Sequence, residues 1–188
     1  MIMVYIFLAT GFEEMEALIT ADILRRCSVE VSLVGVTGEH IEGAHGITVK
    51  SDISIDDVKP GAEMLILPGG MPGVTNLYAC EKLREMLTEQ NSRGGYIAAI
   101  CAAPSILGQL GILKGKRAVC YPGFEDKLTG ARIETDVTVS ADGNIITSKA
   151  AGTTFDFAYR LARLLRGKKE ADRVIGSVFY KLDEQRLD

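Results

Sequence analysis

A cysteine that directly follows an apolar strand is the residue of this chain best placed to do chemistry. Residues 96–100 form an apolar run, Cys101 comes next, and small residues lead into a helical pattern that begins near Ser105. Such a strand-to-helix turn, a nucleophile elbow, places its cysteine at the carboxyl edge of a parallel sheet, where ligands bind. The dipole of the following helix is expected to lower the pKa of the thiol and so activate it. The alternative is a structural cysteine, since free Cys is among the most buried residue types.

A pair of glycines is expected at the same edge of the sheet. Gly69 and Gly70 follow an apolar strand over 63–67 and open a glycine-rich loop. Their N–H groups are suited to an anion, and beside a thiolate they would hold the oxyanion of a hemithioacetal or a tetrahedral intermediate. The loop lacks the Lys-Ser/Thr of a nucleotide-binding loop and the spacing of G-x-G-x-x-G. The alternative is a tight turn that binds no ligand.

The carboxylate best placed to assist Cys101 is Glu16. It lies one turn inside a helix that begins near Phe12, and its side chain is able to point back over the sheet edge. Burial beside Cys101 should raise the pKa of this carboxyl, which would then donate a hydrogen bond to the sulfur and shuttle a proton. We interpret Glu13 and Glu14 as solvated groups that complement the helix dipole. For Glu16 the two interpretations are left open.

The composition of the chain favours some classes of protein and excludes others. The 188 residues, 47% apolar and 24% charged, predict a single globular domain over 1–188. A net charge of -4 gives no direct nucleic-acid signature. No apolar run approaches the roughly 20 residues of a membrane helix, and no signal peptide is apparent, so we expect a cytoplasmic protein without membrane association. The four cysteines show neither C-x-x-C pairing nor His at metal-ligand spacing, so we expect free thiols, no metal and no cofactor.

The alternation of apolar strands with helical patterns predicts an α/β protein, a three-layer α/β/α sandwich with a mostly parallel sheet and antiparallel hairpins at its margins. The expected strands are 3–9, 28–36, 63–67, 96–100, 117–121, 133–140 and 144–148, with a further hairpin turn at 42–46. The expected helices are 12–26, 76–94, 105–113, 155–166 and 170–182. The last of these is expected to bury Val174, Val178 and Phe179 as its apolar face.

Four motifs together resemble the ThiJ/PfpI superfamily, most closely the branch of the Parkinson's-associated protein deglycase and its bacterial ThiJ-type relatives. They are Gly-Phe-Glu-Glu-Met-Glu at 11–16, Leu-Pro-Gly-Gly at 67–70, Ala-Ala-Ile-Cys-Ala-Ala-Pro at 98–104 and Gly-Thr-Thr at 152–154. They occur in order and at matching spacing over essentially the whole chain. The resemblance implies a flavodoxin-like fold, a homodimer, a reactive Cys101 with Glu16 as its partner, and oxyanion-binding amides at Gly69, Gly70 and Ala102.

The chain departs from this family pattern at particular positions. Ala102 stands where the protease-like and chaperone-like branches place a His, so peptidase chemistry is not expected. Tyr121 stands where the deglycase branch often has a His before the proline that matches Pro122, and a phenol with a reference pKa near ~10 is a poor base. The family's basic hairpin residue falls at His45, which we interpret as a turn residue. Tyr121 and His45 are retained as candidate pocket residues.

These residues are compatible with functions of different classes. The first is cysteine-dependent glyoxalase or deglycase activity on small reactive aldehydes or glycated adducts, in defence against carbonyl stress, with Cys101 as nucleophile and Glu16 as proton shuttle. The alternative is an oxidative-stress sensor or chaperone without dedicated turnover, in which Cys101 is oxidised to a sulfinic acid held by protonated Glu16. A role in thiamine biosynthesis, suggested only by the family's label, ranks last because no phosphate-binding loop is present.

Overall fold

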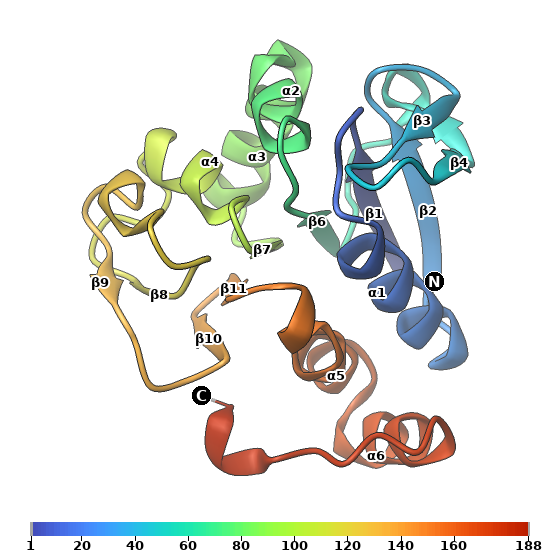
Figure 1. The fold of residues 1–188 in the computed structure, drawn as a ribbon, viewed down its shortest axis with the longest axis vertical. Helices are drawn as coiled ribbons and strands as arrows, with labels where there is room; N and C mark the ends of the chain where they lie inside the picture. The colour runs from blue at the N-terminus through green and yellow to red at the C-terminus, as the bar shows by residue number, and fades with distance from the viewer. Residues whose placement is uncertain (1, 188) are drawn as a thin grey trace.

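A central sheet with helices on both faces forms the body of the computed structural model, which describes residues 2–187 (Figure 1). The strand order is β10-β11-β7-β6-β1-β2-β5, and every adjacent pair is parallel except β10 and β11. The strands are β1 (Met3–Leu8), β2 (Glu30–Gly35), β5 (Ile53–Ser54), β6 (Met64–Leu67), β7 (Tyr96–Ile100), β10 (Val139–Asp142) and β11 (Ile145–Ser148). This confirms the predicted flavodoxin-like α/β fold with a mostly parallel sheet.

The two helical layers are built by the alternation of side chains along each strand. In β1, Val4, Ile6 and Leu8 pack with α1, α5 and α6, whereas Tyr5 and Phe7 pack with α2, α3 and α4 on the opposite face. The helices are α1 (Glu14–Arg26), α2 (Gly73–Ala79), α3 (Glu81–Ser92), α4 (Pro104–Gln109), α5 (Thr154–Arg166) and α6 (Lys168–Ser177). Within residues 2–187, no helix is both long and apolar enough to cross a membrane.

The central strands set up the edge at which the candidate residues meet. β1, β6 and β7 are adjacent and parallel, with Ile6 opposite Ile66 and Leu67 opposite Ala99. Their carboxyl ends therefore lie side by side, so the segments that follow them converge at one place. These segments are the start of α1, the Gly69-Gly70 loop and the Cys101 turn.

Two small sheets flank the central one. The first is the antiparallel pair β3 (His40–Glu42) and β4 (Thr48–Lys50), which confirms the predicted hairpin. The second is the parallel pair β8 (Arg117–Ala118) and β9 (Arg132–Ile133). The expected strand over 133–140 is therefore wrong, because its first residue pairs with β8 and the central sheet resumes only at β10.

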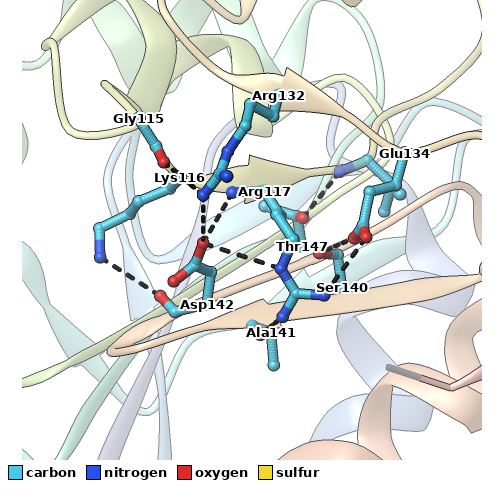
Figure 2. A network of polar contacts seen from close by, with 10 residues as sticks. Gly115, Lys116, Arg117, Arg132, Glu134, Ser140, Ala141, Asp142 and Thr147 are labelled. Carbon is cyan, nitrogen blue, oxygen red and sulfur yellow. Dashed lines mark hydrogen bonds and ion pairs between the residues drawn. The ribbon is translucent and has the colours of Figure 1, made fainter.

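A polar network anchors β8 to the β10–β11 hairpin (Figure 2). The Arg117 guanidinium donates to the carbonyl of Ala141 at 3.0 Å and to Glu134 Oε1 at 3.3 Å, and its backbone N–H donates to Asp142 Oδ2 at 2.9 Å. The Ser140 hydroxyl donates to the other oxygen of Glu134. Glu134 directly follows β9 and forms a charge-assisted bond with Arg117 in place of the backbone pairing of a continued strand.

Other elements also differ from the predicted boundaries. The helix expected over 76–94 is divided into α2 and α3 at Cys80, whose backbone is extended (φ -75°, ψ 107°). Helix α4 ends at Gln109 and is shorter than the predicted 105–113. Helix α6 ends at Ser177, and Phe179, which was expected on its apolar face, has a φ of 58° and is 94% exposed. The edge strand β5 was not predicted.

Candidate active site

Cys101 occupies the sharp turn that ends β7. Its φ of 65° lies in the left-handed region, which costs a non-glycine residue roughly 1–3 kcal/mol and is typical of functional turns. Its backbone N–H donates to the carbonyl of Ser148 at 2.9 Å, and its carbonyl accepts from the Tyr121 N–H at 2.8 Å. These bonds hold the strained backbone from both sides, so the half-buried thiol projects from a fixed position at the carboxyl edge.

Glu16 is buried directly beside this thiol. Its side chain is 1% exposed, and its Oε2 accepts the Gly69 N–H at 2.7 Å. Among the described residues its buried Oε1 has no hydrogen-bond partner, and the Cys101 side chain lies next to the carboxyl. A Cβ atom placed on Gly69 would lie 2.6 Å from Cys101 Cβ and 2.7 Å from Glu16 Oε2, so both side chains crowd the same point.

Burial controls the protonation of both members of this pair. It raises the pKa of Glu16 to about 7, an effect that the Gly69 N–H opposes and the charge of Glu13 reinforces. Burial, followed by the charge of Glu16, raises the pKa of Cys101 to about 12. The predicted rise for Glu16 is confirmed in direction. The predicted lowering for the thiol is wrong, because α4 has only six residues and burial beside a carboxylate outweighs the nearby amides.

The backbone amides near the sulfur divide into two roles. The N–H groups of Ala102 and Gly70 lower the pKa of the Cys101 thiol and so favour its thiolate form, against the larger effect of burial. The N–H of Gly69, expected to join them as an anion donor, instead donates to Glu16. Gly70 has a φ of 87°, and a Cβ atom there would lie 2.4 Å from the Glu13 nitrogen, so only glycine fits this loop.

The two other glutamates of the first turn are buried, which sequence reasoning missed. Glu13 is 8% and Glu14 is 4% exposed, so the interpretation of both as solvated groups is wrong. Glu13 caps α1, accepting the Glu16 N–H at 2.8 Å. Glu14 accepts the backbone N–H of His45 at 2.7 Å and lies 2.9 Å from His45 Nδ1. The only sequence signal was the run of acidic residues itself, which is equally typical of an exposed helix start.

The candidate pocket residues His45 and Tyr121 lie in different places. The His45 side chain is 69% exposed on the β3–β4 turn and is held by Glu14. Tyr121 bonds through its backbone to Cys101, and its 47% exposed side chain packs edge-on against Phe124 with ring centroids 6.5 Å apart. Tyr121 therefore lies beside the thiol turn, whereas the hydrogen bonds of His45 connect it with the start of α1.

One group of side chains within residues 2–187 has the spacing of a metal site. Glu13, Glu14 and His45 offer ligand atoms that all lie within 4.8 Å of one another. These atoms already have protein partners, however, because one Glu13 oxygen accepts from the Glu16 N–H and both Glu14 oxygens accept from His45. Their geometry is accounted for by helix capping and by attachment of the hairpin.

Comparison with known proteins places this arrangement in context. Residues 3–164 match the model of the DJ-1/PfpI family. Protein DJ-1 homolog B of Arabidopsis thaliana is 37% identical over 176 residues, which cover 92% of this chain but 40% of that longer protein. The crystal structure of Drosophila melanogaster DJ-1beta superimposes with a TM-score of 0.92 at 34% identity, covering 96% of this chain and 99% of the other.

Two relatives have names that state an activity. A glutathione-independent glyoxalase of Caenorhabditis elegans is 34% identical over 165 residues, covering 87% of this chain and 88% of the relative. A deglycase of Pyrococcus abyssi is 32% identical over 165 residues, covering 87% of this chain and 99% of the relative. The family model spans the strands, the Glu16 helix and the Cys101 turn, and the fold agrees over almost the whole length. This chain is therefore a member of the DJ-1/PfpI family.

Proposed function

We propose that this protein is a cofactor-independent enzyme that converts 2-oxoaldehydes into 2-hydroxy acids through Cys101 and Glu16. The observation that carries the proposal is the buried carboxyl of Glu16 facing the half-exposed thiol of Cys101. A carboxyl with a pKa of about 7 is close to the ideal for moving protons at neutral pH. The names of the glyoxalase and deglycase relatives support the same class of substrate.

The first step joins the sulfur to the aldehyde carbon. Glu16 in its carboxylate form takes the thiol proton as the sulfur attacks, which avoids a free thiolate in a site where burial raises the pKa of Cys101 to about 12. The carbonyl electron pair moves to the aldehyde oxygen, near the N–H groups of Gly70 and Ala102. Glu16 then passes its proton to this oxygen, which gives a hemithioacetal and restores the carboxylate.

The second step moves hydrogen between the two carbons of the adduct. Glu16 removes the proton from the former aldehyde carbon, and the electron pair forms an enediolate with the neighbouring carbonyl. The carboxylic acid returns that proton to the neighbouring carbon, and the hydroxyl proton of the first carbon passes to the second oxygen. The product is a thioester of a 2-hydroxy acid. Water adds to this thioester, the sulfur leaves, and the thiol regains its proton, so one water is consumed for each 2-oxoaldehyde.

A glycated adduct enters the same sequence when the sulfur bonds to its former aldehyde carbon, the carbon–nitrogen bond breaks, and the amine leaves with the proton that Glu16 took from the thiol. The partly exposed Cys101 at an open sheet edge is compatible with an adduct carried on a larger molecule. Peptidase chemistry receives no such support. The two histidines of the chain, His40 and His45, lie on the β3–β4 hairpin, and the residue after the cysteine is Ala102.

The experiment that tests this function is the conversion of methylglyoxal to lactate without glutathione, followed by proton NMR. Cys101→Ser and Glu16→Gln should each reduce turnover by at least about 100-fold, because nucleophile and base act as one unit. Cys80→Ser, at the junction of α2 and α3, serves as the matched thiol control and should retain wild-type turnover. Wild-type turnover in either active-site variant would contradict the assignment. Reaction of free methylglyoxal but not of its arginine adducts would restrict the substrate class to free aldehydes.

The homodimer implied by the family resemblance is part of the proposal as well. Met15 on α1 and Ile47 on the hairpin turn are 52% and 53% exposed, and Glu14, which precedes Met15, accepts the backbone N–H of Ile47 at 3.5 Å. Exposed apolar side chains on adjoining elements are candidates for an interaction surface. Sedimentation equilibrium should give twice the 20.3 kDa chain mass, and Met15→Lys should weaken the dimer.

A further inference from the structure

Glu13 is the buried charged group next to the reacting pair that the proposed mechanism does not use. It precedes α1 with an extended backbone (φ -83°, ψ 121°), and its carboxylate accepts the Glu16 N–H at 2.8 Å. Ser, Thr, Asp and Asn are the usual residues for this capping role, because a short side chain reaches the amides of its own first turn. A neutral residue would satisfy the same amide. The buried negative charge therefore needs a separate explanation, since burying a charge is costly.

Hydrogen bonds link Glu13, Gly69 and Glu16 into a closed ring. The Glu13 N–H donates to the Gly69 carbonyl at 2.9 Å, the Gly69 N–H donates to Glu16 Oε2 at 2.7 Å, and the Glu16 N–H donates to Glu13 Oε2 at 2.8 Å. The ring ties the first turn of α1 to the loop after β6. It therefore fixes Glu16 through both its backbone N–H and its Oε2, while Oε1 takes no part in the ring.

The charge of Glu13 also acts on Glu16. Three groups act on the Glu16 carboxyl: the Gly69 N–H from the loop, the Cys101 thiol from the end of β7, and Glu13, which caps the same helix. Glu13 is the acidic group of the three, and its negative charge raises the pKa of Glu16. Glu14, the third acidic residue of this turn, is bonded to His45 and directed toward the hairpin.

We propose that Glu13 is a positioning residue, which holds the Glu16 carboxyl against Cys101 through the closed ring of hydrogen bonds and acts on its reactivity through the adjacent buried charge. The inference rests on the proposed function of the Glu16–Cys101 pair and deepens it. A stronger base takes the thiol and carbon-bound protons faster, because rates of proton transfer rise with the basicity of the acceptor. A mere helix cap would leave the basicity of Glu16 unchanged when a neutral acceptor replaced the carboxylate.

The decisive variant is Glu13→Gln, which keeps an oxygen acceptor for the Glu16 N–H and removes the charge. Carbon-13 NMR of labelled glutamate side chains should show Glu16 titrating about half a pH unit or more below the wild type. Methylglyoxal turnover should begin its rise at a correspondingly lower pH and reach a plateau about threefold lower, as expected for a weaker base. Glu30→Gln, an exposed carboxylate at the start of β2, is the matched control and should change neither readout.

The outcomes separate this inference from the proposed function. An unchanged Glu16 titration in Glu13→Gln overturns the inference and reduces Glu13 to a helix cap. A lowered titration without methylglyoxal turnover in the wild type supports the electrostatic role and contradicts the proposed enzyme. Glu13→Ala removes both bond and charge. If that variant fails to fold, Glu13→Gln still decides the question, because the NMR titration requires only a folded protein and no substrate.

Discussion

Glu14 and His45 are 31 residues apart in sequence and are joined twice, through the His45 backbone N–H at 2.7 Å and through its Nδ1 at 2.9 Å. This contact attaches the β3–β4 turn to the first turn of α1. Gly43 makes the close approach possible, because a Cβ atom there would lie 2.3 Å from Glu14 Oε1. The start of α1 is thus held on one side by the hairpin and on the other by the Gly69 loop.

Replacing Glu14 should loosen this attachment. In Glu14→Ala the His45 and Ile47 amides lose a buried charged acceptor, and we expect the free energy of unfolding to fall by about 1–3 kcal/mol. Urea unfolding followed by circular dichroism measures the change. Glu30→Ala removes an exposed carboxylate and should alter stability by less than about 0.5 kcal/mol. Equal stability of the two variants would show that the hairpin does not depend on Glu14.

The same contact should make stability depend on pH with a defined sign. The hydrogen bond and charge of Glu14 raise the pKa of His45 above its ordinary 6.5. Protonated His45 therefore contributes stability fully below pH 6.5, and the contribution is lost as pH rises through the folded-state pKa. For Glu14, burial alone would raise the pKa, but the bonds from His45 outweigh it and hold the pKa below 4.5. The stability from Glu14 is therefore present above 4.5 and lost as the pH falls further.

Comparison of the wild type with His45→Gln across pH 5 to 8.5 isolates this dependence. The wild type should exceed the variant in the free energy of unfolding most at the acidic end of the range, and the two should converge as His45 loses its proton. A difference that grows toward high pH would contradict the assigned ion pair.

Local patterns in the sequence were sufficient to predict the sheet edge and which residues meet at it. The apolar run before Cys101 and the glycines after Leu67 identify strand ends, and parallel strands bring such ends together whatever else the chain does. The burial of Glu13 and Glu14 follows instead from contacts with Gly69 and His45 that lie far away in sequence. An acidic first turn is equally compatible with solvent, so no local pattern distinguishes the two cases.

The pKa of the Cys101 thiol and the ends of the outer elements also depend on contacts that local sequence patterns do not reveal. The dipole argument for Cys101 considered only the helix that follows it, whereas its pKa depends on Glu16 from another part of the chain. The segment after Ile133 has strand-like composition, but there Glu134 bonds to Arg117 and Ser140, and the next strand begins only at Val139. Phe179 follows the apolar spacing of α6, yet the helix has already ended at Ser177. Periodicity predicts which faces are apolar but not where competing contacts end an element.

Adding a single methyl group at Gly69 should strongly reduce both turnover and stability. In Gly69→Ala the new Cβ would lie 2.6 Å from Cys101 Cβ and 2.7 Å from Glu16 Oε2, so both reacting groups must move apart. We expect methylglyoxal turnover to fall by about 100-fold or more, and stability to fall by roughly 1–3 kcal/mol.

Gly176→Ala is the matched control, because nothing lies within 4 Å of its added methyl group. Since Gly176 is inside α6, that change should stabilise the protein by about 0.5–1 kcal/mol. Turnover of Gly69→Ala within twofold of the wild type would contradict the crowded geometry.

Glu16→Gln should separate the acidity of the thiol from catalysis. The charge of Glu16 helps to raise the pKa of Cys101 to about 12, so a neutral amide at this position should lower that pKa. The rate of Cys101 alkylation by iodoacetamide, measured by mass spectrometry from pH 6 to 11, should therefore rise at lower pH in the variant than in the wild type. Turnover of methylglyoxal should nevertheless be lost, because the amide takes up no proton from sulfur or carbon. Alkylation of Cys27, which is buried in the cluster that α1, α5 and α6 form on one face of the sheet, provides an internal reference for accessibility in both proteins. A thiol that became harder to ionise in Glu16→Gln would show that the carboxyl stabilises the thiolate, and the role of Glu16 as the base in the first step would be wrong.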